Sequence, residues 1–210
     1  MDELLQTIAG VDEEDDLLVR ILSARWPGTA LELTIKVSVD DGDELGEWSI
    51  RCRHLLTQRL GSEAAFSLEL TDDHPSLWAF KYPNASAFFS GVPANSQACV
   101  GALYQAHEGA VRGWLDFGYG VNPTSHIADI LRSGGGLLAR GPVPLLEIYR
   151  DALLPHGVDV SIVGEHHLKF FDGVNHRSTA GEDVEVLLLG HSYAVGIGWT
   201  AERSTNRDLS

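Results

Sequence analysis

The most informative segment of the sequence is residues 136–163, GLLARGPVPLLEIYRDALLPHGVDVSIV. A short apolar strand, Leu137–Arg140, ends at Gly141, and Pro142 stands near the first helical position, where its missing N–H is tolerated. An apolar stripe at helical spacing follows, made of Leu145, Ile148, Tyr149 and Ala152. Gly157 then stands where the C-cap glycine of that helix is expected.

After that glycine the chain alternates again, with Val158, Val160 and Ile162 on one face. The segment therefore predicts a strand–helix–strand unit near residues 137–163. Its connection is long enough for a right-handed parallel crossover between neighbouring strands. A strand from elsewhere in the chain could also lie between the two.

Three further segments alternate at the spacing of half-buried strands. In Leu31–Val39, apolar residues fall on one face and polar residues on the other. Trp48–Cys52 and Phe66–Leu70 repeat the pattern, and Asp40–Asp43 supplies turn residues after the first strand. We expect these strands to form an antiparallel meander with one face in water.

Residues 1–25 predict a helix on each side of the acidic run Asp12–Asp16. Asp2 can cap the first helix, and acids at the start of the second suit its positive dipole end. The apolar positions at helical spacing are Leu4, Leu5, Ile8, Leu17, Leu18, Ile21 and Leu22. We expect the acidic run to be a solvated helix start, with a docking site for a basic partner as the alternative.

The middle of the chain predicts strand and loop, followed by helices. Residues 75–92 hold the densest aromatic stretch, and prolines within and after it disfavour a helix. Ser96 can cap a helix whose apolar stripe includes His107. A loop at Gly118–Gly120 and a short helix in residues 122–131 follow.

Together these patterns predict an α+β fold, with a mainly antiparallel sheet and helices packed on one face. It includes the strand–helix–strand unit near 137–163, an N-terminal helical segment in residues 1–25, and further strands near 166–171 and 184–199.

The same patterns predict one domain over residues 1–200, with two lobes, 26–122 and 123–200, as the alternative. Residues 201–210 are polar, and we expect a flexible tail there.

The charge of the chain limits its possible partners. It has 210 residues, 15 Lys and Arg against 30 Asp and Glu, a formal net charge of −15 and a pI near 4.8. Phosphate backbones repel such a surface, so we expect no nucleic-acid binding. A basic protein is the class of partner that this charge favours.

The N-terminus carries acids where a secretory signal needs basic residues, and no apolar run reaches the roughly 20 residues of a membrane span. The two cysteines, Cys52 and Cys99, are far apart in the sequence and suggest no disulfide framework. We therefore expect a soluble, cytoplasmic protein with no disulfide and no membrane association.

The segment Gly190–Ala194, GHSYA, resembles the G-x-S-x-G nucleophile elbow of the α/β-hydrolases. That family places its acid and its histidine after the serine, whereas no histidine follows His191 here. The residues after Ser192 alternate as a strand and not as the helix that an elbow needs. We therefore interpret Gly190 and His191 as a hairpin turn.

Nine histidines occur, and several stand beside acids. If a metal site exists, the candidate ligands are His74, His107, Glu165 and His166. No HExxH motif is present, and His107 lies on an apolar helix stripe, which favours a packed, hydrogen-bonded imidazole. Structural or surface histidines are the favoured interpretation.

Aromatic residues and one arginine give the candidate binding site. They are Trp78, Phe80, Tyr82, Tyr119 and Arg140. Aromatic residues dominate both cores and interfaces, so the same residues also fit a buried core. Arg140 at a strand-to-helix turn could contact an anion, although a tight turn explains the same residues.

No complete catalytic constellation is present in the sequence, so we assign no catalytic residue and expect no cofactor. The leading hypothesis is a non-catalytic module that binds a protein partner. One alternative is a metal-dependent hydrolase that uses the histidines and acids named above. Another is a small-ligand binding protein that uses the aromatic stretch and Arg140.

Overall fold

The computed structural model describes residues 1–11, 16–39, 43–121 and 126–204, and of Tyr119 only the backbone. The fold is α+β and mainly antiparallel, as the sequence predicts.

The chain divides into two compact units, which are described separately. The first unit comprises residues 1–73, 170–177 and 182–210, and the second comprises 74–169 and 178–181. These boundaries differ from the two lobes considered above, because the first unit takes segments from both parts of the chain.

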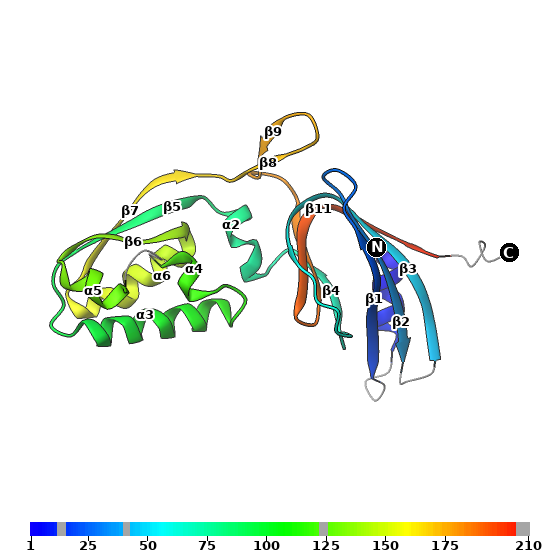
Figure 1. The fold of residues 1–210 in the computed structure, drawn as a ribbon, viewed down its shortest axis with the longest axis horizontal. Coiled ribbons are helices and arrows are strands. Elements are labelled where there is room, and N and C mark those ends of the chain that lie inside the picture. The colour runs from blue at the N-terminus through cyan, green and yellow to red at the C-terminus, as the bar shows by residue number, and fades with distance from the viewer. Residues whose placement is uncertain (12–15, 40–42, 122–125, 205–210) are drawn as a thin grey trace. The chain divides into compact units, whose positions relative to one another are not determined.

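The first unit is built on sheet A, six antiparallel strands in the order β1-β2-β3-β11-β10-β4 (Figure 1). The strands are β1 Leu17–Arg25, β2 Leu31–Val39, β3 Asp43–Arg59, β4 Leu68–Thr71, β10 Val184–Leu189 and β11 Ser192–Arg203. The first three form an antiparallel meander, of which the sequence predicted only the pairing of β2 with β3. The strand expected at Phe66–Leu70 begins two residues later and pairs with β10 instead of β3.

Sheet A curls until its two edges meet. The backbone N–H of Val19 in β1 donates to the carbonyl of Ala65 (2.7 Å), and Ala65 N–H donates back to Val19 (2.8 Å). Ala65 lies shortly before β4, the opposite edge of the sheet. Hydrogen bonding therefore continues across the junction between the first and last strands.

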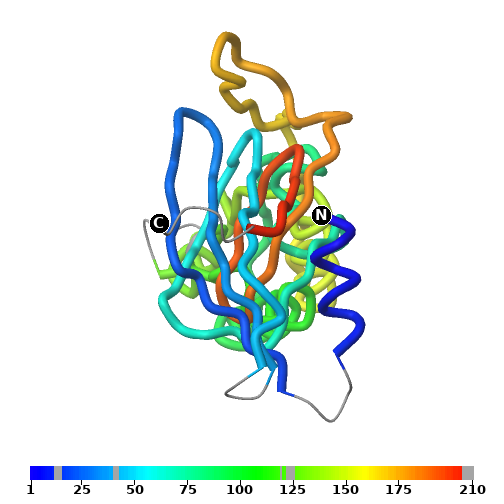
Figure 2. The backbone as a smooth tube through the Cα atoms, turned by 90° about the vertical axis from the view of Figure 1, so that its right-hand side faces the viewer, coloured from blue at the N-terminus to red at the C-terminus, as the bar shows by residue number. Residues whose placement is uncertain are grey.

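A short helix, α1 (Asp2–Ala9), packs on sheet A beside β11 and β4 (Figure 2). Leu4 is completely buried in the core that the helix shares with the sheet. The sheet supplies most of this core, including Leu31, Leu33, Ile35, Val37, Trp48, Ile50, Cys52, Leu187, Leu189 and Trp199. The alternation seen in the sequence of β2 therefore marks its buried side correctly.

The prediction of a helix in residues 17–25 is wrong, because these residues form β1. Their apolar positions fit both helical and strand spacing, and pairing with β2 satisfies the backbone and buries Val19. Asp2 lies in the first turn of α1 and is not its cap, since Met1 takes the N-cap position. Asp12–Asp15 and Asp40–Gly42 lie outside the described residues.

The expected tail also needs correction. Residues 201–203 belong to β11, which pairs with β3 as far as Arg203. The remaining tail is described only at Ser204, whose N–H donates to the carbonyl of Glu47 (2.8 Å).

The second unit contains sheet B, three strands in the order β6-β5-β7. The strand–helix–strand unit predicted from the sequence is β6 (Gly135–Pro142), α6 (Val143–Leu153) and β7 (Asp159–His166). β5 (Asn84–Ser90) lies between its two strands and is antiparallel to both. The inserted-strand alternative is therefore the arrangement found.

Helices cover one face of sheet B and enclose the second core. α3 (Ser96–Val111) packs against α6 and against α5 (Ile127–Arg132). The core residues come from all three helices and from the sheet, and include Ala87, Phe89, Leu103, Leu131, Leu138, Leu146 and Tyr149. Asn95 caps α3, one residue before the predicted Ser96, by accepting from Gln97 N and Ala98 N.

Short helical turns replace some of the strand and loop expected in residues 75–92. Pro75–Leu77 forms the 3-10 turn η1, and Trp78–Lys81 forms the single helical turn α2. The expected loop at Gly118–Gly120 lies in the turn α4 (Phe117–Gly120), which Asp116 caps. The aromatic residues there favour no period strongly, which explains both differences.

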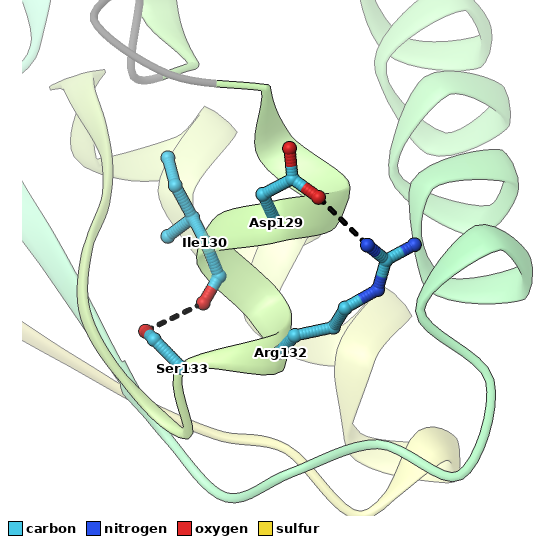
Figure 3. Close-up of polar contacts among 4 residues, drawn as sticks. All are labelled: Asp129, Ile130, Arg132 and Ser133. Carbon is cyan, nitrogen blue, oxygen red and sulfur yellow. Dashed lines mark hydrogen bonds and ion pairs between the residues drawn. The ribbon is translucent and has the colours of Figure 1, made fainter.

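The last turn of α5 is held by two side chains (Figure 3). Arg132 Nη1 donates to Asp129 Oδ1 at 2.7 Å, and Ser133 Oγ donates to the Ile130 carbonyl at 2.7 Å. Gly134 follows with a φ of 78°, a conformation that glycine adopts without strain. The predicted start of this helix at residues 122–124 lies outside the described part of the chain.

The strands β8 (Lys169–Phe171) and β9 (His176–Ser178) form a two-stranded hairpin. Its turn is held by Asp172 Oδ1, which accepts from Val174 N at 2.8 Å and from Asn175 N at 2.7 Å. These bonds lower the pKa of the Asp172 carboxyl, because they stabilise its charged form.

None of the described helices is both long enough and apolar enough to span a bilayer.

Candidate functional site

His74, the first of the candidate metal ligands, caps the turn η1. Its Nδ1 accepts from Ser76 N at 3.3 Å and lies 2.8 Å from Ser76 Oγ. The imidazole also meets the edge of the Trp114 ring, with centroids 4.6 Å apart. The nitrogen facing the 3-10 turn is therefore already engaged by the backbone and hydroxyl of Ser76.

His107 lies in the core of the second unit and is 1% exposed. Its Nε2 donates to the carbonyl of Leu115 at 2.8 Å, since a carbonyl only accepts. In the neutral imidazole, Nδ1 then accepts from the hydroxyl of Tyr149 at 2.7 Å. Both ring nitrogens are used within the fold, which is the packed imidazole that the helix stripe favours.

Glu165 and His166 lie exposed at the end of β7. His166 Nδ1 lies 3.1 Å from the carbonyl of Gly164. His74 caps η1 and His107 lies in α3. In the part of the chain that the structure describes, no three His, Cys, Asp or Glu side chains gather to hold a metal ion. The four candidate ligands are not brought together.

The GHSYA segment is a hairpin, as interpreted from the sequence. Gly190 has a φ of 57°, and the flanking residues Leu189 and Ser192 pair across β10 and β11. Ser192 is 8% exposed, and its Oγ accepts from Gly61 N at 2.8 Å. This hydrogen bond holds the segment at Gly61, between β3 and β4, against the start of β11.

The candidate binding residues lie around β6. Arg140 is an exposed residue of β6, and the turns α2 and α4 both pack against this strand. Trp78 packs on the second core, whereas Tyr82 is 45% exposed. Phe80 is half-buried, and the side chain of Tyr119 lies outside the described atoms. Core packing thus accounts for part of the set.

Cys52 is completely buried in the core of sheet A. Burial raises the pKa of its thiol to about 11, against the opposing effect of weak hydrogen bonds to the backbone of Ile197 and His54. A thiol of this kind is poorly nucleophilic. It packs against Gly196, where β11 has a register shift.

The junction between β1 and Ala65 leaves apolar side chains in water. Phe66 follows Ala65 and is 70% exposed, and Leu22 of β1 is 50% exposed. Val19 and Ala65 point into the core, so their neighbours Leu18 and Phe66 face outward. Leu18 is half-buried, and the outward-facing Arg20 lies between it and Leu22 along β1. We call Leu18, Leu22 and Phe66 the seam patch.

Exposed carboxylates lie next to the seam patch in the chain. Asp16 precedes β1, Glu63 precedes the junction, and Glu69 lies in β4. Arg20 and Arg25, in β1, are exposed cations within the same stretch, and Lys36 of β2 lies across from Arg20. An aromatic anchor with a polar surround that carries both signs of charge is the composition of a protein-binding surface.

The negative charge of the chain belongs almost wholly to the first unit. That unit has 9 Lys and Arg against 23 Asp and Glu, a formal charge of −14. The second has 6 against 7, a formal charge of −1. The seam patch therefore lies in the unit whose field attracts cations.

No sequence pattern marks the seam patch. Phe66 has the same parity as Leu68 and Leu70, so a continuous strand would have buried it. The strand instead begins at Leu68, and the bridge at Ala65 turns Phe66 outward. Leu22 is exposed because it has the same parity along β1 as Arg20 and the opposite parity to the buried Val19.

Comparisons with protein-family models, with curated proteins and with solved structures gave no match to this chain.

Proposed function

We propose that the protein is a non-catalytic binding module whose first unit captures a basic protein partner at the seam patch. The observation that carries the proposal is an exposed apolar patch, centred on Phe66, in a unit with a formal charge of −14. Apolar burial would supply affinity, and the acidic field would select the partner and speed its approach.

The two kinds of interaction make separable contributions. A long-range field is screened within about 8–10 Å at physiological salt, so the charge term weakens as salt rises. Burial of an aromatic side chain is much less sensitive to salt. Binding should therefore weaken at high salt and be lost on truncation of Phe66.

The test uses the full chain as bait in an extract of its own cells, with captured proteins cross-linked and identified by mass spectrometry at low and high salt. Three baits are compared with the wild type: Phe66→Ser, the double variant Glu63→Gln with Glu69→Gln, and Phe171→Ser. Phe171 is 47% exposed in the same unit but lies outside the seam patch, so Phe171→Ser is the matched control.

The expected result is a basic protein that the wild type and Phe171→Ser capture at low salt and that Phe66→Ser fails to capture. With this protein purified, Phe66→Ser should weaken affinity at least about tenfold, and the Glu63/Glu69 variant should lower the association rate. Equal capture by Phe66→Ser and Phe171→Ser, or an acidic partner, would overturn the proposal.

A further inference from the structure

The two edges of sheet B are protected to different degrees. β6 carries Pro142, a register shift beside Leu138, and an isolated bridge from Val121 to Ala139. On the other edge, no described residue pairs with the outer side of β7. In sheet A the edges are joined at Val19 and Ala65. β7 therefore presents backbone N–H and C=O groups to solvent.

The N-terminal part of β7 has one of the features that normally protect an edge strand, the charged residue Asp159, and lacks others. Asp159–Val163 pairs with β5 in continuous register and contains neither proline nor lysine. The register shifts only beyond Val163, near Gly164, whose φ is 75°. A straight run of backbone groups is thus available for an additional strand.

Apolar side chains beside this edge would be covered by such a strand. Val163 is 48% exposed, and Phe88 on the neighbouring strand is 44% exposed. Both lie on the sheet face opposite the helices, since Ala87 and Ile162 pair on the helix side. On the helix side of the sheet, Val160 is also only partly buried.

The surroundings of the edge carry negative charge. Asp159 and Glu165 are exposed residues of β7, and Glu147 and Asp151 are exposed on α6, which packs under this strand. Arg150 is the described cation among them, and it pairs with both acids of its own helix. The edge therefore suits a strand that brings cations.

From these observations we infer that the outer edge of β7 binds an extended segment of a partner protein in which apolar residues alternate with polar ones and Lys or Arg stand at the ends. Backbone hydrogen bonds to Asp159–Val163 would hold the segment, and the apolar residues on one of its faces would cover Val163 on the open face of the sheet. This surface is separate from the seam patch, and the inference does not depend on the proposed function.

The test uses a synthetic probe, the capped peptide acetyl-Lys-Val-Thr-Val-Thr-Val-Lys-amide, titrated into the full chain. Hydrogen exchange resolved by NMR should show slower exchange for the amides of residues 159–163 that point away from β5, which are every second one. Amides of β6 should stay unchanged. A peptide with Glu in place of both Lys should bind at least about tenfold more weakly, because it meets like charge.

Two matched variants distinguish binding at the edge of β7 from non-specific association. Val163→Lys places a cation on the open face beside the edge, and Val92→Lys makes the same change at a 68% exposed valine outside the sheet. Val163→Lys should weaken binding of the peptide that carries the two Lys residues by about tenfold or more. Val92→Lys should leave the binding of this peptide unchanged. Circular dichroism checks that both variants fold.

Absence of protection at residues 159–163, or equal effects of the two variants, would overturn the inference. Sedimentation of the peptide-free chain over a range of concentrations tests the competing occupant. A dimer that Val163→Lys abolishes and Val92→Lys preserves would show that a second copy of the chain takes this edge, and would overturn the basic strand as occupant.

Discussion

Gly196 is the residue with the least room in the sheet A core. A Cβ built there would lie 2.1 Å from Cys52 Sγ and 2.7 Å from the carbonyl oxygen of His54. Gly196→Ala should therefore destabilise the protein by about 3 kcal/mol, as overpacked cores do. Urea unfolding followed by circular dichroism measures this, and a loss below about 1 kcal/mol would contradict the contact.

Gly101 provides the opposite case. It is an exposed residue within α3, and an added Cβ there would meet nothing within 4 Å. Gly101→Ala should stabilise the protein by about 0.5–1 kcal/mol, because alanine loses less backbone entropy in a helix. The same urea titration checks the sign, and a destabilised variant would mean that this face of α3 is covered.

Cys52 predicts a dependence of stability on alkaline pH. The pKa of its thiol rises from 9.0 to about 11 on folding, so the unfolded chain loses this proton first. The stabilising contribution is complete below pH 9 and is lost as pH rises towards 11, by about 2–3 kcal/mol in total. Unfolding free energies at pH 8 to 11 should fall less steeply in Cys52→Ala.

Burial also raises the pKa values of Cys99 and Tyr149, and both groups remain in that variant. The wild type minus variant difference therefore isolates Cys52. If the unfolding free energies of the wild type and of Cys52→Ala fell in parallel with rising pH, the raised pKa of the Cys52 thiol would be contradicted.

At the scale of elements, the His107 link between α3 and α6 yields the next prediction. Tyr149→Phe removes the hydroxyl that donates to His107 Nδ1 and leaves that buried nitrogen without its partner. The cost should be about 1–3 kcal/mol. Tyr104→Phe is the control, because Tyr104 is a 51% exposed residue of α3, and it should change the free energy of unfolding little.

Element types were predictable where one period dominated the sequence. β2 alternates strictly, and α6 has a helical stripe between a proline and a glycine, so both were predicted correctly. β1 was missed because its apolar run fits two periods, and pairing with β2 decides between them.

Pairings over long sequence separations could not be predicted. The bridge between Val19 and Ala65, which creates the seam patch, depends on the curl of the whole sheet. For the same reason, the insertion of β5 between β6 and β7 was one of two open alternatives. The free edge of β7 follows from that order and has no local signature.

At the scale of the whole molecule, the uneven charge predicts an uneven response to salt. Self-repulsion in a unit with a formal charge of −14 weakens as salt screens it, whereas a unit at −1 has little to gain. Hydrogen exchange between about 20 and 500 mM NaCl should show greater added protection for amides of β2 and β3 than for those of α3 and α6. Equal gains in the two units would contradict this.

The pairing of β3 with β11 also determines when the first unit can form on the ribosome. β3 pairs with β11, so the sheet lacks two of its strands until the chain has been synthesised as far as Arg203. All strands of the second unit have by then left the exit tunnel or are close to leaving it, and that unit can fold while the first still waits. Until then β1, β2 and β3 expose the residues of their future core, and this nascent meander is the part of the chain most in need of a chaperone.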